Sequence, residues 1–538
     1  MIESMERKTL IRGGTIVDGT GKPAFVADVL VEGDRIVDVI PDTSPNSIIR
    51  SFDHSIIEAS GLIVSPGFID AHTHSDAYLV IEPDAPSKIT QGITTELNGQ
   101  CGGSVAPRYG EARLSSDWAA ILAGRLTWHS LCEYREVLES AKPAVNTVQF
   151  IGHNTLRSSV VGYAARAATP EDLRQMSYLL EQSLDEGGWG LTTGLIYQPG
   201  KYSTPEEVVA LAKVAATKGG YYATHMRSEG DRILEAIDEV IELVKATGIK
   251  AEISHLKTSG RKNWSKIDAV LEKIEGAMGK GLLLGSDRYP YCAAGTDLDI
   301  VLPDWAQEGA APAEMKRLED AGLRARIIEE INSSDRDWSE VMIGGTWAEE
   351  NKPYSGKTVA EILSPSSSLF PLPSSLTPGE LITSILLADG CKTGAFFFGM
   401  SEENLKKIYS RPWIVPGSDA SLRAPWGPLG ADHPHPRAYA TMPEFYRRVR
   451  ALGFSREETI ARMTSVIADR FGIKGRGRIE KGAYADLVIW DEAEFKAKAT
   501  FTEPHQFTGG VRCVMVNGTI PYRDGAFTGD RGGRFLER

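Results

Sequence analysis

Polar and ionisable residues recur in this sequence at one kind of position, directly after short apolar segments that have the character of β-strands. They are His72, His74, Cys101, His153, Tyr197, His225, His255, Asp287 and Asp419. Imidazole nitrogens, thiolates and carboxylate oxygens are the ligand atoms that zinc accepts in proteins. An isolated histidine pair is satisfied by hydrogen bonds about as often as by a metal. The recurrence of such residues after successive segments favours a metal centre.

Local patterns around His72, Cys101 and Asp419 suit such a centre. One residue separates His72 from His74, so both imidazoles lie on the same side of a strand. Cys101 stands in NGQCGG, where the glycines allow the backbone to turn and the thiolate to face inward. The other four cysteines are interpreted as ordinary apolar residues. Asp419, in PGSDAS, has three open interpretations: a metal ligand, a proton acceptor for water, or the cap of a following helix.

The elements that must position these side chains are short strands alternating with helical patterns. We count eight candidate strands, at residues 67–74, 92–99, 147–154, 190–197, 220–227, 250–257, 281–291 and 412–419. One connecting helix is clear at 204–220, where Thr-Pro begins it and a glycine pair ends it. Eight βα units predict an α/β fold, a (β/α)8 TIM barrel, whose catalytic residues lie at the carboxyl ends of its strands.

The chain termini have a different texture, with alternating apolar residues and glycine-containing turns, which predicts a small β-sandwich domain formed from both ends. The predicted boundaries are residues 1–65 and 474–538 for this domain and 66–473 for the barrel. A connector of about 120 residues between the seventh and eighth strands predicts a long insertion at about 297–410. Its Ser- and Pro-rich stretch, 364–380, is expected on the surface, and the insertion is expected to form an active-site lid.

Composition limits the partners. The chain of 538 residues is 42% hydrophobic and carries a formal net charge of −13, which disfavours nucleic acid and anionic membranes. Five cysteines without a framework spacing, no signal peptide and no apolar run of spanning length predict a cytoplasmic protein. We expect a small-molecule substrate. Whether the chain forms a homo-oligomer stays open.

Taken together, these motifs resemble those of the amidohydrolase superfamily, and within it the N-acyl-D-amino-acid deacylases, also called D-aminoacylases. The resemblance covers most of the chain. It rests on SPGFIDAHTHSD (65–76), ITQGITTELNGQCGGSVAP (89–107), IGHNTLR (151–157), GLTTGLIY (190–197), ATHMRSEGD (223–231), ISHLK (253–257), DRYPY (287–291), GSD (417–419), HPHPR (433–437) and ADLVIWD (485–491). The sequence departs from the family at Glu96, where the family usually has an apolar residue.

The resemblance implies the roles of individual residues. Cys101, His225 and His255 match the ligands of a tightly held zinc, and His72, His74 and Asp419 match residues around a second, weaker metal position. Asp419 also matches the general base. Residues that match substrate-binding positions are Tyr197, Lys257 and Arg437.

The implied chemistry is hydrolysis of an amide in a substrate that carries a carboxylate. Zinc lowers the pKa of water and polarises the scissile carbonyl, while Asp419 takes the proton and delivers it to the leaving nitrogen. Arg437 suits a carboxylate because a guanidinium binds it through two parallel hydrogen bonds. The expected substrates are N-acyl-D-amino acids or related small amides and peptides.

Three alternatives remain. A cyclic amidase of the same superfamily needs a lysine at the end of the fourth strand, and GLTTGLIY has none. A deaminase shares the histidine and aspartate pattern but leaves Cys101 without a role. A non-catalytic scaffold is expected to lose ligands, whereas all the expected ligands are present.

Overall fold

The computed structural model describes residues 8–41, 55–114, 122, 124–364, 373 and 375–538. Each of the eight segments predicted as barrel strands contains a strand of a parallel sheet. These strands are β6 (Phe68–Asp70), β7 (Ile93–Asn98), β8 (Asn146–Gln149) continued by β9 (Ile151–Gly152), β10 (Gly190–Gly194), β11 (Tyr221–His225), β12 (Lys250–Ile253), β13 (Leu284–Arg288) and β17 (Ile414–Pro416).

Two parallel ladders make up the barrel wall. One has the order β6-β7-β8 and the other β17-β13-β12-β11-β10-β9. The ladders meet where β8 runs into β9, and again where Ala71 N donates to Pro416 O at 3.2 Å and Asp419 N to His72 O at 2.8 Å. The TIM-barrel prediction is therefore confirmed, and strand ends that are far apart in sequence reach one mouth.

Helices follow the strands and cover the barrel. They are α1 (Tyr78–Ile81), α2 (Pro86–Ile89), α4 (Leu131–Ala141), α5 (His153–Val160), α6 (Pro170–Asp185), α7 (Pro205–Thr217), α8 (Ile233–Thr247), α9 (Ile267–Met278), α15 (Glu402–Tyr409), α16 (Arg437–Ala451), α17 (Arg456–Met463) and α18 (Ser465–Phe471). The helix predicted at 204–220 is confirmed as α7: the Thr204 side chain accepts from Glu207 N, and Pro205 is the first helical residue. No helix among the described residues is both long and apolar enough to cross a membrane.

Both chain ends contribute to a separate nine-stranded sheet of β1 (Lys8–Ile16), β2 (Phe25–Glu32), β3 (Arg35–Pro41), β4 (Ser55–Glu58), β5 (Ile63–Pro66), β18 (Leu487–Trp490), β19 (Val511–Val516), β20 (Thr519–Arg523) and β21 (Ala526–Phe527). The termini meet where β18 runs antiparallel to β5. Apolar residues from both ends, among them Val29, Val64 and Leu487, share one core. The boundaries at residues 65 and 474 stay a prediction.

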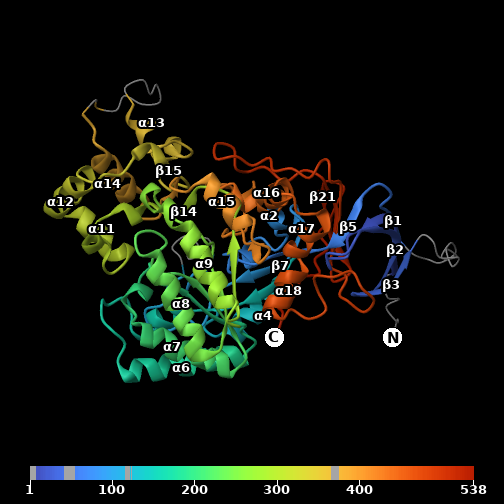
Figure 1. The fold of residues 1–538 in the computed structure, drawn as a ribbon. Coiled ribbons are helices and arrows are strands. Elements are labelled where there is room, and N and C mark those ends of the chain that lie inside the picture. The colour runs from blue at the N-terminus through green and yellow to red at the C-terminus, as the bar shows by residue number, and fades with distance from the viewer. Residues whose placement is uncertain (1–7, 42–54, 115–121, 123, 365–372, 374) are drawn as a thin grey trace.

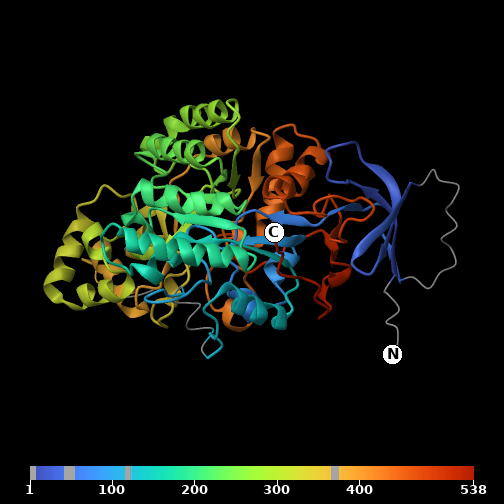
Figure 2. The same cartoon turned by 90° about the horizontal axis from the view of Figure 1, so that it is seen from below.

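The connector between β13 and β17 folds into a unit with its own core. Its antiparallel sheet has the order β14 (Ala294–Asp297), β16 (Gly394–Phe397), β15 (Val341–Ile343), and its helices are α10 (Asp304–Gln307), α11 (Ala311–Glu319), α12 (Ala321–Asn332), α13 (Val359–Leu363) and α14 (Pro378–Asp389). Figures 1 and 2 place these helices at the end of the molecule opposite β1–β3. Most of the stretch 364–380, predicted to be exposed, lies outside the described residues; its last residues begin α14.

Candidate metal centre and active site

Nitrogen and sulfur atoms from four strand ends meet at the mouth of the barrel. Cys101 Sγ lies 3.3 Å from His72 Nε2, 3.3 Å from His255 Nε2 and 3.7 Å from His225 Nδ1. Ligand atoms of His72, Cys101, His255 and Asp419 all lie within 4.8 Å of one another, and those of His225, Glu229 and His255 form an overlapping group. This set of N, S and O donors fits zinc.

The backbone holds three of these residues in an unusual conformation. Cys101, His255 and Asp419 have positive φ angles of 51°, 37° and 51°. Such angles cost roughly 1–3 kcal/mol in a non-glycine residue and persist only where the surroundings impose them. Here His255 N donates to Asp287 Oδ1 at 3.0 Å, and Asp419 N donates to His72 O. The fold therefore expends stability to aim these side chains at one point.

The Asp419 carboxylate contacts two histidines and one arginine of the site. Its Oδ1 lies 3.1 Å from His74 Nε2 and 3.3 Å from His72 Nε2, and its Oδ2 accepts from Arg437 Nη1 at 2.8 Å. Burial opposes ionisation, but Arg437 and the histidines outweigh it and hold the pKa of Asp419 well below its usual range. The interpretation of Asp419 as a helix cap is wrong, because the first helical element after Asp419 begins only at Gly427, eight residues further along the chain.

The Cys101 thiol is surrounded by groups that favour the thiolate. Burial raises its pKa, yet the neighbouring His72 and His255, with a hydrogen bond from His225, bring the pKa of Cys101 well below its ordinary value. A thiolate is the form of cysteine that binds metals. The residue after Cys101 has no room for a side chain, because a Cβ added at Gly102 would lie 2.6 Å from Gly194 N.

A second layer of carboxylates orients the histidines. Asp287 Oδ2 lies 3.2 Å from His72 Nδ1. Glu229 lies 2.9 Å from His255 Nδ1 and 3.6 Å from His225 Nε2, and it pairs with Lys257. A carboxylate on the outer nitrogen of a metal-binding histidine fixes the ring and its tautomer. Asp287 is among the strand-end residues singled out in the sequence, without a specific role, and Glu229 stands unremarked within the motif ATHMRSEGD (223–231).

Comparisons with known proteins show to which family the chain belongs. A profile of the amidohydrolase family matches residues 55–522. D-aminoacylase of Alcaligenes xylosoxydans xylosoxydans is 33% identical over 534 residues, covering 98% of this chain and 97% of that protein. The chain belongs to the amidohydrolase family.

Two solved structures resemble this amidohydrolase over nearly its whole length. A D-aminoacylase whose binuclear metal centre was studied has a TM-score of 0.80 at 31% identity, covering 98% of this chain and 99% of that one. N-acyl-D-glutamate deacylase from Bordetella bronchiseptica, in complex with zinc and a phosphonate inhibitor that mimics the tetrahedral intermediate, has a TM-score of 0.81 at 29% identity, covering 99% and 100%.

Cationic and aromatic side chains form one wall beside the metal cluster of this amidohydrolase. The Tyr289 ring centroid lies 3.9 Å from Arg288 Cζ, 4.6 Å from Arg437 Cζ and 5.8 Å from Lys257 Nζ. Tyr289 Oη, Arg437 Nε and two Arg288 nitrogens are buried with no hydrogen-bond partner among the described residues. Arg437 Nη2 also donates to Gly295 O at 3.2 Å, so the first strand of the insertion borders the site. The Tyr197 ring centroid lies 4.9 Å from that of His225.

Two residues singled out in the sequence lie outside this cluster. His153 begins α5, and its Nε2 lies 2.9 Å from Glu207 Oε1, on the helix side of the wall. Glu96, the departure from the family pattern, is fully buried 3.1 Å from Lys88 Nζ, which also pairs with Asp70 at 3.1 Å. The buried Glu96 carboxylate is therefore paired with Lys88, which it shares with Asp70.

Proposed function

We propose that this amidohydrolase is a zinc-dependent hydrolase that cleaves the amide bond of N-acyl-D-amino acids. Its similarity to a D-aminoacylase and to an N-acyl-D-glutamate deacylase over at least 96% of each chain supports the substrate class and the D configuration. The convergence of Cys101 with three histidines and Asp419 is the observation that carries the proposal.

The proposed metal ligands are those that the family resemblance implies, and all of them lie at the mouth of the barrel. Cys101, His225 and His255 would hold one zinc tightly, while His72, His74 and Asp419 surround a second, weaker position. When bound, zinc supplies a Lewis acid that polarises a carbonyl oxygen and makes water a nucleophile near neutral pH. Glu229 and Asp287 hold the imidazoles in place for this purpose.

Asp419 is the proposed general base. Its depressed pKa keeps it ionised at neutral pH, so it can take a proton from the attacking water and return it to the leaving nitrogen. His74 and Arg437 each contact one of its oxygens and so fix the plane of the carboxylate.

The buried donors beside Tyr289 are the proposed binding site for the substrate α-carboxylate. A buried polar group without a partner calls for an explanation, and a bound carboxylate would satisfy Tyr289 Oη and Arg437 Nε together. Lys257 adds positive charge, and Tyr197, beside His225, would also contact the substrate. Because these buried donors have no acceptor among the described residues, we expect a substrate that carries a carboxylate.

A substrate screen tests the proposal. N-acetyl-D- and N-acetyl-L-amino acids, given to zinc-loaded protein with release of the free amino acid measured, should show hydrolysis of the D series. Chelation should abolish the activity and added zinc restore it, and Cys101→Ala should be inactive under the same conditions. Hydrolysis of neither series, or equal activity of the Cys101→Ala protein, would contradict the proposal.

A further inference from the structure

A large basic pocket lies far from the metal cluster, where the small β-domain meets the barrel. Its volume is about 900 Å³, within the size range of small-molecule sites. Lys142 precedes β8 and Trp189 precedes β10, so the pocket lies at the amino ends of the barrel strands. The metal cluster lies at their carboxyl ends, on the opposite face.

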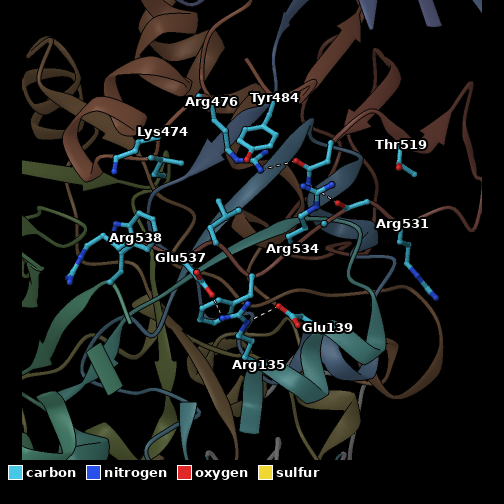
Figure 3. Close-up of a pocket in the computed structure, with 18 of the residues that line it drawn as sticks. Arg135, Glu139, Lys474, Arg476, Tyr484, Thr519, Arg531, Arg534, Glu537 and Arg538 are labelled. Carbon is cyan, nitrogen blue, oxygen red and sulfur yellow. Dashed lines mark hydrogen bonds and ion pairs between the residues drawn. The ribbon is translucent and has the colours of Figure 1, made fainter. Parts of the chain in front are cut away.

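The charge of the pocket is opposite to that of the chain. Eight lysine and arginine side chains line it against two glutamates, although the protein as a whole carries −13. Figure 3 shows labelled cations from several segments of the chain that line the pocket, with Arg476 above, Arg135 below, Arg538 to one side and Arg531 to the other. A hollow lined by one sign of charge concentrates counter-ions of the other sign.

Five of these cations have carboxylate partners. Arg135 pairs with Glu139 and Glu537, and Arg476 with Asp486. Asp34 lies 2.8 Å from Arg534 and 3.5 Å from Arg35, and Asp84 lies 3.0 Å from Arg531. These pairs hold the arginines in place around the space.

Three cations are left over. Lys142, Lys474 and Arg538 are exposed and have no hydrogen-bond or ion-pair partner for their side chains among the residues that the structure describes. They come from the end of α4, the segment after α18 and the C-terminal segment. Cations from three separate parts of the chain therefore border one pocket without an ion-pair partner among the described residues.

Contacts within the protein fix part of the pocket wall. The Tyr484 ring lies between two guanidinium groups, with Arg35 Cζ 3.4 Å and Arg476 Cζ 4.0 Å from its centroid. The C-terminal segment is fixed beside β8, because Thr147 N donates to Arg534 O and Leu536 N to Thr147 O, both at 2.8 Å. The paired arginines are held in place before binding and so lose little entropy when an anion arrives.

We propose that this pocket binds a compact anion with two or more phosphate groups, which joins the small β-domain, the barrel and the C-terminal segment. Lysine ammonium and arginine guanidinium groups are the usual protein ligands of phosphate. A ligand that binds only the folded protein raises its stability, so occupancy should raise the melting temperature.

The test uses trimetaphosphate, a compact trianion that chelates divalent metals weakly, and the zinc-loaded full chain. Binding is measured by calorimetry and by the shift in melting temperature, at constant ionic strength set with chloride. One variant carries Lys142→Ala, Lys474→Ala and Arg538→Ala. Its matched control carries Lys22→Ala, Lys213→Ala and Lys280→Ala, which removes the same charge at exposed lysines outside the pocket.

We expect saturable binding and a higher melting temperature in the wild type and in the control. The pocket variant should bind about tenfold more weakly, since three charge contacts are lost. All six side chains are exposed, so both variants should fold, which their melting temperatures without anion will show. Equal weakening in both variants would mean unspecific attraction, and full binding by the pocket variant would place the anion elsewhere, at the metal site for example. Either result, or no saturable binding by the wild type, overturns the proposal. Hydrolytic activity is not part of the readout, so failure here leaves the proposed function untouched.

Discussion

The substitution Arg437→Lys keeps the positive charge at the proposed carboxylate site but removes the planar guanidinium, so it shows which of the two the substrate needs. The guanidinium uses Nη1 for Asp419 and Nη2 for Gly295 O, while the buried Nε has no partner among the described residues. It can therefore hold the base and still offer a donor to a substrate. A lysine ammonium is a point charge and cannot serve Asp419, Gly295 O and a carboxylate in one plane.

The expected loss follows from the contacts that disappear. A hydrogen bond to a charged group contributes about 1.5–3 kcal/mol, which corresponds to a fall in kcat/KM of about 10- to 150-fold for one lost contact. If the lysine also fails to donate a hydrogen bond to Asp419, the fall in kcat/KM should be larger. The folded structure should survive, because the buried positive charge beside Asp419 is retained.

The assay compares two enzymes with two substrates. Wild type and Arg437→Lys are each given an N-acetyl-D-amino acid and its carboxamide, and kcat/KM is measured for all four combinations. The wild type should strongly prefer the acid, and the variant should lose most of that preference. Equal turnover of acid and carboxamide by the wild type would refute the clamp. The same fractional loss on both substrates would show that Arg437 acts only through Asp419.

Two further variants test the base and the buried ion pairs. Asp419→Asn keeps the shape of the side chain but cannot take a proton, so turnover should fall about 100-fold or more while tightly bound zinc, measured by elemental analysis, remains; near-normal turnover would exclude Asp419 as the base. Lys88→Met leaves Asp70 and Glu96 buried without their cation and should lower the free energy of unfolding by about 3–5 kcal/mol in a urea titration. The exposed Lys213→Met should change it by no more than about 0.5 kcal/mol, and equal effects of the two substitutions would contradict the account.

The sequence predicts the barrel and the main cluster well because both depend on local patterns. Strand periodicity and turn residues located all eight barrel strands, and the carboxyl ends of parallel strands necessarily meet at one mouth. For that reason Cys101, His225 and His255 could be expected at the same mouth, whereas their grouping as ligands of one zinc came from the family resemblance. The same reasoning wrongly placed His153 at this mouth. In the structure β9 ends at Gly152, and the His153 side chain turns outward with α5 to contact Glu207.

Partners supplied by loops were beyond sequence reasoning. Glu229 lies four residues after His225, but in an irregular segment, where that spacing has no geometric meaning. Glu96 was recognised as unusual, yet only the three-dimensional structure brings Lys88 beside it. The basic pocket is assembled from segments of both domains, and no pattern within one segment predicts it.

Metal content measured on Cys101→Ala decides whether Cys101 holds a zinc ion. Elemental analysis of the purified wild type should find at least one zinc per chain, and Cys513→Ala, which removes a buried cysteine of the small β-domain, should keep it. Cys101→Ala should remain folded and lose most of its zinc, because the thiolate stands between His72, His225 and His255. Full zinc content in folded Cys101→Ala protein would contradict the metal centre described for this amidohydrolase.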